Sequence, residues 1–267
     1  MRPYLITSIL VLFCLYWLAG CKKDSKDLSL PVINLSSTNI TGKSEHQIQV
    51  TVSMTLPDGF KQLLITKGVN LKIDSAYGTN GVLTANASST GTNTYQYIFT
   101  YTLSPDEVDK LVGFLFVVTD NKGRSMEKDL TVNTTVSGAQ TIFSHKWALV
   151  SKLWKSAVPP SETITDCEKD DTYQFNRDST MSINYGTLAC TFDGFNIYDK
   201  WTLSPDEKIF TQTYHSVFNP AAITIDTFNV ISIASDKLVM STVVDLSAFG
   251  PPYTDHEQFI YTYNAVQ

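Results

Sequence analysis

The chain has 267 residues, with 20 basic and 26 acidic side chains and a net charge of −6 at neutral pH. Its lysines and arginines are scattered, whereas proteins that bind nucleic acids or anionic membrane surfaces concentrate them in patches. The composition therefore excludes nucleic acid as a partner, and also a polybasic membrane contact. A hydrophobic fraction of 43%, rich in Tyr, Phe, Thr and Val, indicates a folded protein built mainly of β-strands.

The first 20 residues have the pattern of a removable signal peptide. Arg2 precedes an apolar run at 4–18, which is shorter than the stretch of about 20 residues that a membrane-spanning helix needs. The run ends in Leu18-Ala19-Gly20-Cys21, which resembles the lipobox of bacterial lipoproteins. The resemblance implies removal of residues 1–20 and lipid attachment at Cys21, so that an N-terminal lipid holds the protein on a membrane.

The cysteine is followed at 22–29 by KKDSKDLS, a charged stretch without apolar periodicity. We expect residues 21–29 to form a solvated tether. The stretch loosely resembles the export signal of Bacteroidetes surface lipoproteins, with lysines among its acids. Together the two resemblances imply an outer-membrane lipoprotein of the bacterial cell envelope, on either the periplasmic or the surface face.

Residues 30–137 are expected to form a β-sandwich. Turn residues separate seven strand-like runs, at 31–35, 47–56, 63–73, 81–85, 95–101, 112–119 and 126–132. Ser104-Pro105-Asp106-Glu107 has the pattern of a helix N-terminus and predicts a short helix at 105–111. Asp120-Asn121-Lys122-Gly123 predicts a hairpin turn. The surrounding segment 115–131 (LFVVTDNKGRSMEKDLT) resembles the last two strands of bacterial immunoglobulin-like and cadherin-like modules, which implies an immunoglobulin-like sandwich.

A polar stretch at 133–141 (NTTVSGAQT) marks a domain boundary, and residues 143–267 form the second expected domain. It contains eight strand-like runs, at 146–154, 172–176, 180–185, 196–203, 209–214, 223–233, 237–244 and 258–263. Eight short strands predict an up-and-down β-barrel, which leaves no sheet edge exposed. The fold class predicted for the whole chain is therefore all-β.

Several segments of the second domain resemble the lipocalin-like domains of bacterial lipoproteins: HKWALVS at 145–151, DCEKDDTYQFNRDSTMSINYGTLAC at 166–190 and KWTLSPDEKIF at 200–210. The resemblance implies a lipocalin-like barrel. His145 and Ser179 stand at two positions where that family has glycine.

Four cysteines divide into two groups. Cys14 leaves with the signal peptide and Cys21 carries the lipid, so Cys167 and Cys190 remain. Exported proteins fold in an oxidising compartment, and these two cysteines flank a predicted hairpin. We expect a disulfide between them, with two separate buried thiols as the alternative.

No motif for catalysis or for metal binding is present in the sequence. The four histidines, His46, His145, His215 and His256, lie at none of the spacings that metal sites use. Acidic residues gather in turns, such as 168–171 and 206–207, where exposure to solvent is the ordinary explanation. We therefore expect a protein that is not an enzyme and that uses no cofactor or metal.

The aromatic residues of the second domain indicate where a ligand could bind. An eight-stranded barrel either fills with side chains or holds one small ligand. Strand alternation over 196–203 predicts that Asp199 and Trp201 share a face with Ile197, at a ligand-binding mouth. The alternative places Asp199 at a rim facing solvent. The candidate ligand-binding residues are Trp147, Asp199, Trp201 and Tyr261.

Two further segments resemble the short O-glycosylation acceptors of Bacteroidetes proteins. They are Asp74-Ser75-Ala76 and Asp178-Ser179-Thr180. The resemblance implies glycan attachment at Ser75 and Ser179.

The expected function is that of a lipid-anchored, non-catalytic cell-envelope protein whose barrel binds a small apolar or amphipathic ligand. The alternative is a surface interaction or glycan-binding module with a solid barrel. A cavity lined by aromatic side chains would favour the first function, and coplanar exposed aromatic rings would favour the second.

Overall fold

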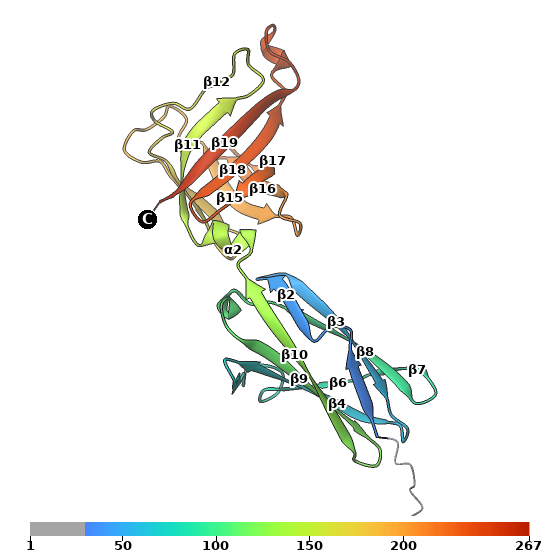
Figure 1. The fold of residues 1–267 in the computed structure, drawn as a ribbon. Helices are drawn as coiled ribbons and strands as arrows, with labels where there is room; N and C mark the ends of the chain where they lie inside the picture. Colours follow the sequence, from blue (N-terminus) through green and yellow to red (C-terminus); the bar gives the residue numbers. More distant parts are fainter. Residues whose placement is uncertain (1–29, 267) are drawn as a thin grey trace, which may run out of the picture.

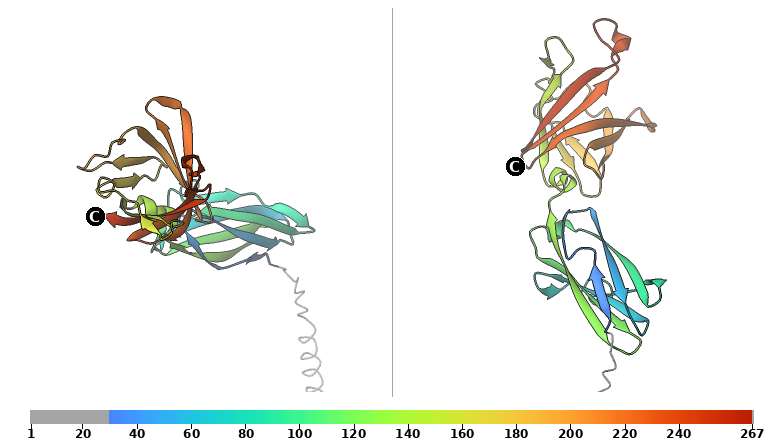
Figure 2. Two further views of the ribbon diagram at one scale, coloured as in Figure 1. Left: turned by 90° about the horizontal axis from the view of Figure 1, so that it is seen from above. Right: turned by 45° about the vertical axis from the view of Figure 1, so that its right-hand side comes forward.

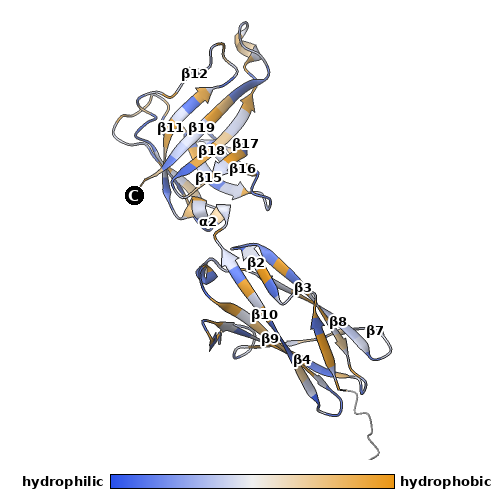
Figure 3. Ribbon diagram, viewed as in Figure 1, coloured by the Kyte–Doolittle hydropathy of each residue, from blue (hydrophilic) through white to orange (hydrophobic). Residues whose placement is uncertain are grey.

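The computed structural model describes residues 30–266. The signal peptide, Cys21 and the tether at 21–29 lie outside the described residues. The fold is all-β, as predicted. Hydrophobic and hydrophilic residues alternate along many of the strands (Figure 3), because one face of each strand packs inward and the other meets solvent. The buried side chains form one cluster between residues 33 and 132 and a second between residues 142 and 263.

The first cluster lies between two β-sheets of a sandwich. One sheet has the strand order β1-β3-β8-β7, and the other has the order β2-β10-β9-β4-β5, with β6 also paired to β4. Phe99 meets Phe114 and Phe116 edge to face across the core. The strands are β1 (Val32–Leu35), β2 (Asn39–Lys43), β3 (Gln47–Thr55), β4 (Phe60–Val69), β5 (Lys72–Ile73), β6 (Val82–Ala85), β7 (Ser88–Gly91), β8 (Thr94–Thr102), β9 (Val112–Asp120) and β10 (Ser125–Thr135).

Local sequence signals of this domain are confirmed with three differences. Ser104 and Glu107 form the expected capping box, but the helix is a 3₁₀ helix that covers only Pro105–Glu107 instead of the predicted 105–111. The run at 63–73 is not one strand, because Asn70 and Leu71 adopt positive φ values and turn the chain from β4 into β5. Strands β2 and β7 were not predicted, since they are short, polar and exposed.

The second cluster fills a nearly closed, eight-stranded antiparallel barrel, which confirms the predicted barrel and its strand count. The strand order is β14-β13-β11-β19-β18-β17-β16-β15, with β12 added beside β11. Between β14 and β15 the ladder reduces to a bridge from Thr180 to Lys200. The strands are β11 (Lys146–Trp154), β12 (Ser161–Glu162), β13 (Thr172–Phe175), β14 (Met181–Asn184), β15 (Asn196–Leu203), β16 (Ile209–Ser216), β17 (Asn219–Ile233), β18 (Lys237–Val244) and β19 (Glu257–Val266).

A short helix, α2 (Gly138–Phe143), lies between the sandwich and the barrel (Figures 1 and 2). Its Ile142 is fully buried in the barrel core, and the carbonyl oxygen of Ile142 accepts the indole N–H of Trp147 at 2.8 Å. The amide of Gly138 donates to Glu207 at 2.8 Å, and Glu207 also pairs with Lys43 of the sandwich. The helix therefore closes the end of the barrel that faces the sandwich.

The disulfide between Cys167 and Cys190 is confirmed, with a Cα–Cα distance of 5.3 Å. Cys167 precedes β13 and Cys190 follows β14, so the bond joins the two outer ends of this hairpin. It braces the end of the barrel that lies away from α2.

Replacing both cysteines (Cys167→Ser with Cys190→Ser) should lower the free energy of unfolding of the barrel by about 3 kcal/mol, because the unfolded chain is then less constrained. Urea titration followed by tryptophan fluorescence measures this domain, since Trp147, Trp154 and Trp201 all lie in it. A reducing agent should destabilise the natural protein by a similar amount and leave the double variant unchanged. An unchanged urea midpoint in the double variant would contradict this expectation.

Candidate functional site

Two of the predicted ligand-binding residues lie in the core of the barrel. Trp147 is completely buried, and Trp201 is 4% exposed. The Trp201 ring stacks on Phe210 and meets Phe175 edge to face. Its indole N–H donates to the carbonyl oxygen of Asn176 at 2.9 Å. Both tryptophans therefore pack the closed part of the barrel, and we leave them out of the candidate site.

The predicted placement of Asp199 beside Trp201 is wrong. The pairing of β15 with β16 shifts register between Tyr198 and Lys200, so a β-bulge interrupts the alternation at Asp199. Trp201 points inward, whereas Ile197 is exposed and Asp199 bonds His215 at 2.8 Å. This placement matches the alternative reading of Asp199 as a rim residue better than it matches a ligand-binding mouth.

Tyr261 remains on the inner face of the barrel. It is half-buried, and its ring meets the buried Phe228 edge to face at 5.5 Å. Burial, with smaller effects of Asp226 and Glu168, raises the pKa of Tyr261 to about 12. The hydroxyl therefore stays protonated at neutral pH and can donate a hydrogen bond.

The two residues suggested for glycan attachment differ in exposure. Ser75 is exposed in the segment that follows β5. Ser179 is half-buried, and its carbonyl oxygen accepts the amide N–H of Trp201 at 2.9 Å. Ser179 also has a φ of 69°, a conformation that favours glycine, which is the residue that the resembling family has at this position.

The open end of the barrel contains a pocket of about 470 Å³. The hairpin β13–β14, the first residues of β15 and the two disulfide-linked segments surround it. Tyr173 and Ile183 face each other across the hairpin, and Tyr198 lies on β15. The pocket is lined mainly by Lys152, Glu168, Asp171, Tyr173, Ile183, Tyr185, Cys167, Cys190, Phe192, Asp193 and Tyr198. We call it the mouth pocket.

A second hollow, of about 190 Å³, continues from the mouth pocket between β14 and β15. The two share Ile183, Tyr185, Asn196 and Tyr198. Strands β14 and β15 separate here, because the bridge between Thr180 and Lys200 joins them only at the end that lies nearer to α2. The mouth pocket therefore opens both at the end of the barrel and through its side.

Asp171 is the chemically distinctive residue of the mouth pocket. It is 4% exposed, and its buried Oδ1 atom has no hydrogen-bond partner among the described residues. Burial, together with the negative charges of Asp193, Asp170 and Glu168, raises the pKa of Asp171 to about 6. A buried carboxylate without a partner is costly to the fold, and such groups require an explanation.

The neighbouring carboxylates all have partners in the protein. Glu168 accepts the amide of Thr165 and pairs with Lys152 at 3.1 Å. Asp170 accepts the amides of Thr187 and Leu188. Asp193 lies in the loop that follows Cys190, and it accepts the amide N–H of Cys190 at 2.6 Å. These hydrogen bonds hold the loops around the pocket in place. Oδ1 of Asp170 is also buried without a partner, but Asp170 does not line the pocket, whereas Asp171 does.

Asp171 is not among the residues predicted from the sequence, because the acidic stretch at 168–171 indicates a solvated turn. That interpretation is wrong for Asp171, which the disulfide-linked segments cover. The signal that could have identified it is position: Asp171 immediately precedes the strand-like TYQF run of the predicted hairpin, between the two cysteines. A carboxylate there lies at the barrel end rather than on a free turn.

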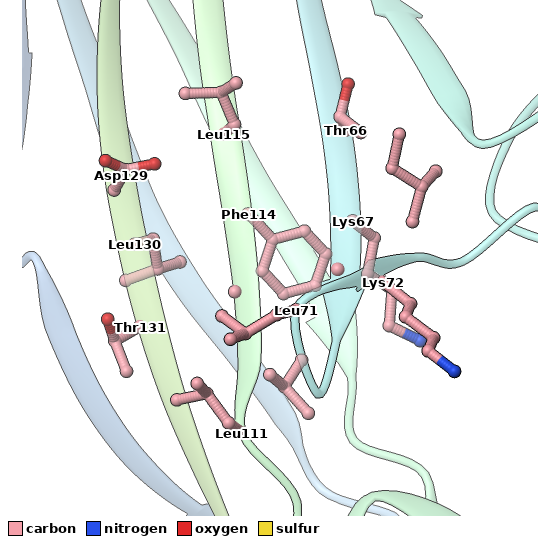
Figure 4. Close-up of a pocket in the computed structure, with 14 residues that line it drawn as sticks. Thr66, Lys67, Leu71, Lys72, Leu111, Phe114, Leu115, Asp129, Leu130 and Thr131 are labelled. Carbon is pink, nitrogen blue, oxygen red and sulfur yellow. The ribbon is translucent and has the colours of Figure 1, made fainter.

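A larger hollow, of about 540 Å³, lies on the outer face of the sandwich (Figure 4). Gly68 and Gly113 face each other there on adjacent strands, and the missing side chains leave the depression. Leu71 and Leu111 stand exposed at its border. Lys67, which also borders this hollow, is already paired with Asp74 and Glu107. Since no buried polar group without a partner lines this hollow among residues 30–266, we favour the mouth pocket as the functional site.

Among residues 30–266, no three His, Cys, Asp or Glu side chains come together in a way that could hold a metal ion. In the same part of the chain, no helix has the length and hydrophobicity that crossing a membrane requires.

Comparisons with known proteins give structural neighbours only. No family model matches the chain, and no curated protein matches it. A DUF4466 family protein from Parabacteroides merdae, a Bacteroidetes species, is similar in structure: TM-score 0.33, 10% identity, 90% of this chain and 99% of that chain covered. The sporulation control protein Spo0M from Bacillus subtilis has a TM-score of 0.27 at 8% identity, covering 75% and 89% of the two chains. Neither similarity is close enough to carry an inference about function.

Replacing Asp171 with asparagine (Asp171→Asn) should stabilise the barrel at about pH 7.5 by at most about 3 kcal/mol. Folding raises the pKa of Asp171 to about 6. An acid of this kind destabilises the folded state increasingly as the pH rises from the pKa of the unfolded chain to the pKa of the folded protein. The gain should therefore nearly vanish at about pH 3, below both pKa values, where Asp171 is mostly protonated in the folded and the unfolded state. Urea titrations at the two pH values measure it.

Asp166→Asn is the matched control, because this carboxylate lies on the same loop and is 88% exposed. It should change stability little at either pH. A loss of stability in Asp171→Asn at the higher pH would show that the buried carboxylate has a stabilising partner.

Proposed function

We propose that this protein is a lipid-anchored, non-catalytic component of the bacterial cell envelope that binds a small amphipathic ligand in the mouth pocket. The observation that carries the proposal is the combination of a 470 Å³ pocket with a buried, unpartnered carboxylate oxygen. Ligand pockets typically join apolar and aromatic walls with a few polar groups that fix orientation. Tyrosine rings and Ile183 would supply the walls, and Asp171 the orienting group.

The sequence resemblances give each domain a role in this proposal. The sheet orders β1-β3-β8-β7 and β10-β9-β4 support an immunoglobulin-like sandwich, in which four strands face the three central strands of the other sheet. The eight antiparallel strands support a lipocalin-like barrel. With the lipid at Cys21, the sandwich would act as a spacer between the membrane and the barrel.

A second candidate function is recognition of a surface or a glycan. Phe192 and Phe218 are 73% and 77% exposed, and Phe195 lies between them with edge-to-face contacts to both. Exposed aromatic clusters often mark interaction sites. These three rings are steeply inclined to one another rather than coplanar, however, and Phe192 also borders the mouth pocket. We therefore assign the cluster to the entrance of the pocket.

Titration of the full-length protein with the fluorescent probe N-phenyl-1-naphthylamine tests the binding function. Ile183→Trp fills the space that the mouth pocket and the side opening share, and it should weaken probe binding by about tenfold or more. Ile225→Trp is the control, since Ile225 is 63% exposed on β17 of the same barrel. Equal affinity in the natural protein and both variants would show that the mouth pocket does not take the probe.

Cys21→Ser tests the lipid anchor. Without the cysteine sulfur, the protein should lose incorporation of radiolabelled fatty acid and should retain its N-terminal 20 residues, because lipid attachment precedes cleavage in bacterial lipoproteins. Metabolic labelling and mass spectrometry of the purified protein measure both effects. Unchanged labelling of the variant would rule out Cys21 as the attachment site.

A further inference from the structure

We infer that the ligand of the mouth pocket carries a protonated amine, and that this amine binds Asp171. The inference rests on the proposed function and adds the chemical class of the group that the pocket accepts.

The first argument is the unmatched acceptor. The other two acids that line the pocket, Glu168 and Asp193, each accept a hydrogen bond from a loop amide. The buried Oδ1 atoms of Asp170 and Asp171 both have no partner in the described part of the chain, but Oδ2 of Asp170 accepts two loop amides and Asp170 does not line the pocket. Asp171 is also more than nine-tenths buried and lines the pocket. The complementary ligand group must therefore be a hydrogen-bond donor.

The second argument is charge. Three carboxylates line the pocket, those of Glu168, Asp171 and Asp193, against the single lysine Lys152. Lys152 already pairs with Glu168 at 3.1 Å, so it leaves Asp171 without a counter-charge. A cationic donor would compensate the buried charge through a charge-assisted hydrogen bond, which a neutral donor does less well. An anionic ligand group would be repelled.

The third argument is the aromatic wall. Tyr173, Tyr185 and Tyr198 line the pocket together with Asp171. Aromatic faces attract organic cations and also pack against apolar groups. Since the acidic side chains do not converge as a metal-ligand set within residues 30–266, an organic cation fits the pocket better than a metal ion.

Three indole probes that share one ring system test the inference by isothermal titration calorimetry with the full-length protein. At about pH 7.5 tryptamine is cationic, tryptophol is neutral and indole-3-acetate is anionic. Tryptamine should bind about tenfold or more tightly than tryptophol, and indole-3-acetate should bind most weakly. Asp171→Asn should remove the advantage of tryptamine and leave tryptophol unchanged. The control Asp166→Asn should change neither affinity.

A pH series adds an independent readout. The affinity for tryptamine should fall as pH drops through about 6, where Asp171 becomes protonated, whereas the affinity for tryptophol should stay constant. The other titratable groups facing Asp171 are Glu168, Asp170, Asp193 and Lys152, with the three wall tyrosines. Burial raises the pKa of Glu168, but the hydrogen bonds from Thr165 and Lys152 and the charge of Lys152 lower it below its usual value. Burial raises the pKa of each of the three tyrosines.

The outcomes separate this inference from the proposed function. If tryptamine and tryptophol bind equally, and Ile183→Trp weakens both, the pocket binds ligands but the amine inference is wrong. If tryptamine binding survives in Asp171→Asn, the cation lies elsewhere and the inference is also wrong. If none of the indoles and no N-phenyl-1-naphthylamine binds, the proposed function itself fails.

Discussion

The closure of the barrel at Trp201 is the constraint on which the rest of the second domain depends. The amide of Trp201 donates to Ser179 and its indole N–H donates to Asn176, so two bonds fasten β15 to the turn between β13 and β14. The ring itself is buried against Phe175 and Phe210. The two hydrogen bonds and the buried ring of Trp201 therefore hold β14 and β15 together at one place. These two strands are the first and last in the barrel order, and no continuous ladder of backbone hydrogen bonds joins them.

Because β14 and β15 are joined at one end only, their other ends are not paired with each other. Beyond the bridge from Thr180 to Lys200, β14 and β15 separate, and the disulfide between Cys167 and Cys190 holds the outer end of the hairpin instead. Helix α2 fills the opposite end of the barrel with Ile142. The barrel is thus filled with side chains near the sandwich, whereas its far end contains the mouth pocket.

The strand pattern was predictable because burial imposes a two-residue period on it. Strands β11, β15 and β18 begin and end where the alternation of apolar residues predicted. The bulge at Asp199 could not be read from this pattern, since an inserted residue shifts every later side chain to the other face. The burial of Asp171 and the partial burial of Glu207 were also hidden, because distant segments cover them. The disulfide-linked loops cover Asp171, and the sandwich covers Glu207.

The mouth pocket is lined both by Asp171, whose burial destabilises the fold, and by the disulfide between Cys167 and Cys190, which stabilises it. Keeping the Asp171 carboxylate buried and ionised costs at most about 3 kcal/mol at neutral pH, by the size of its pKa shift. Closing the loop between Cys167 and Cys190 contributes about 3 kcal/mol in the opposite direction. The two effects are of the same order, and they act on the same few segments of chain. The disulfide can therefore offset the cost of the unpaired acid, so the open end stays folded although Asp171 is buried without a partner.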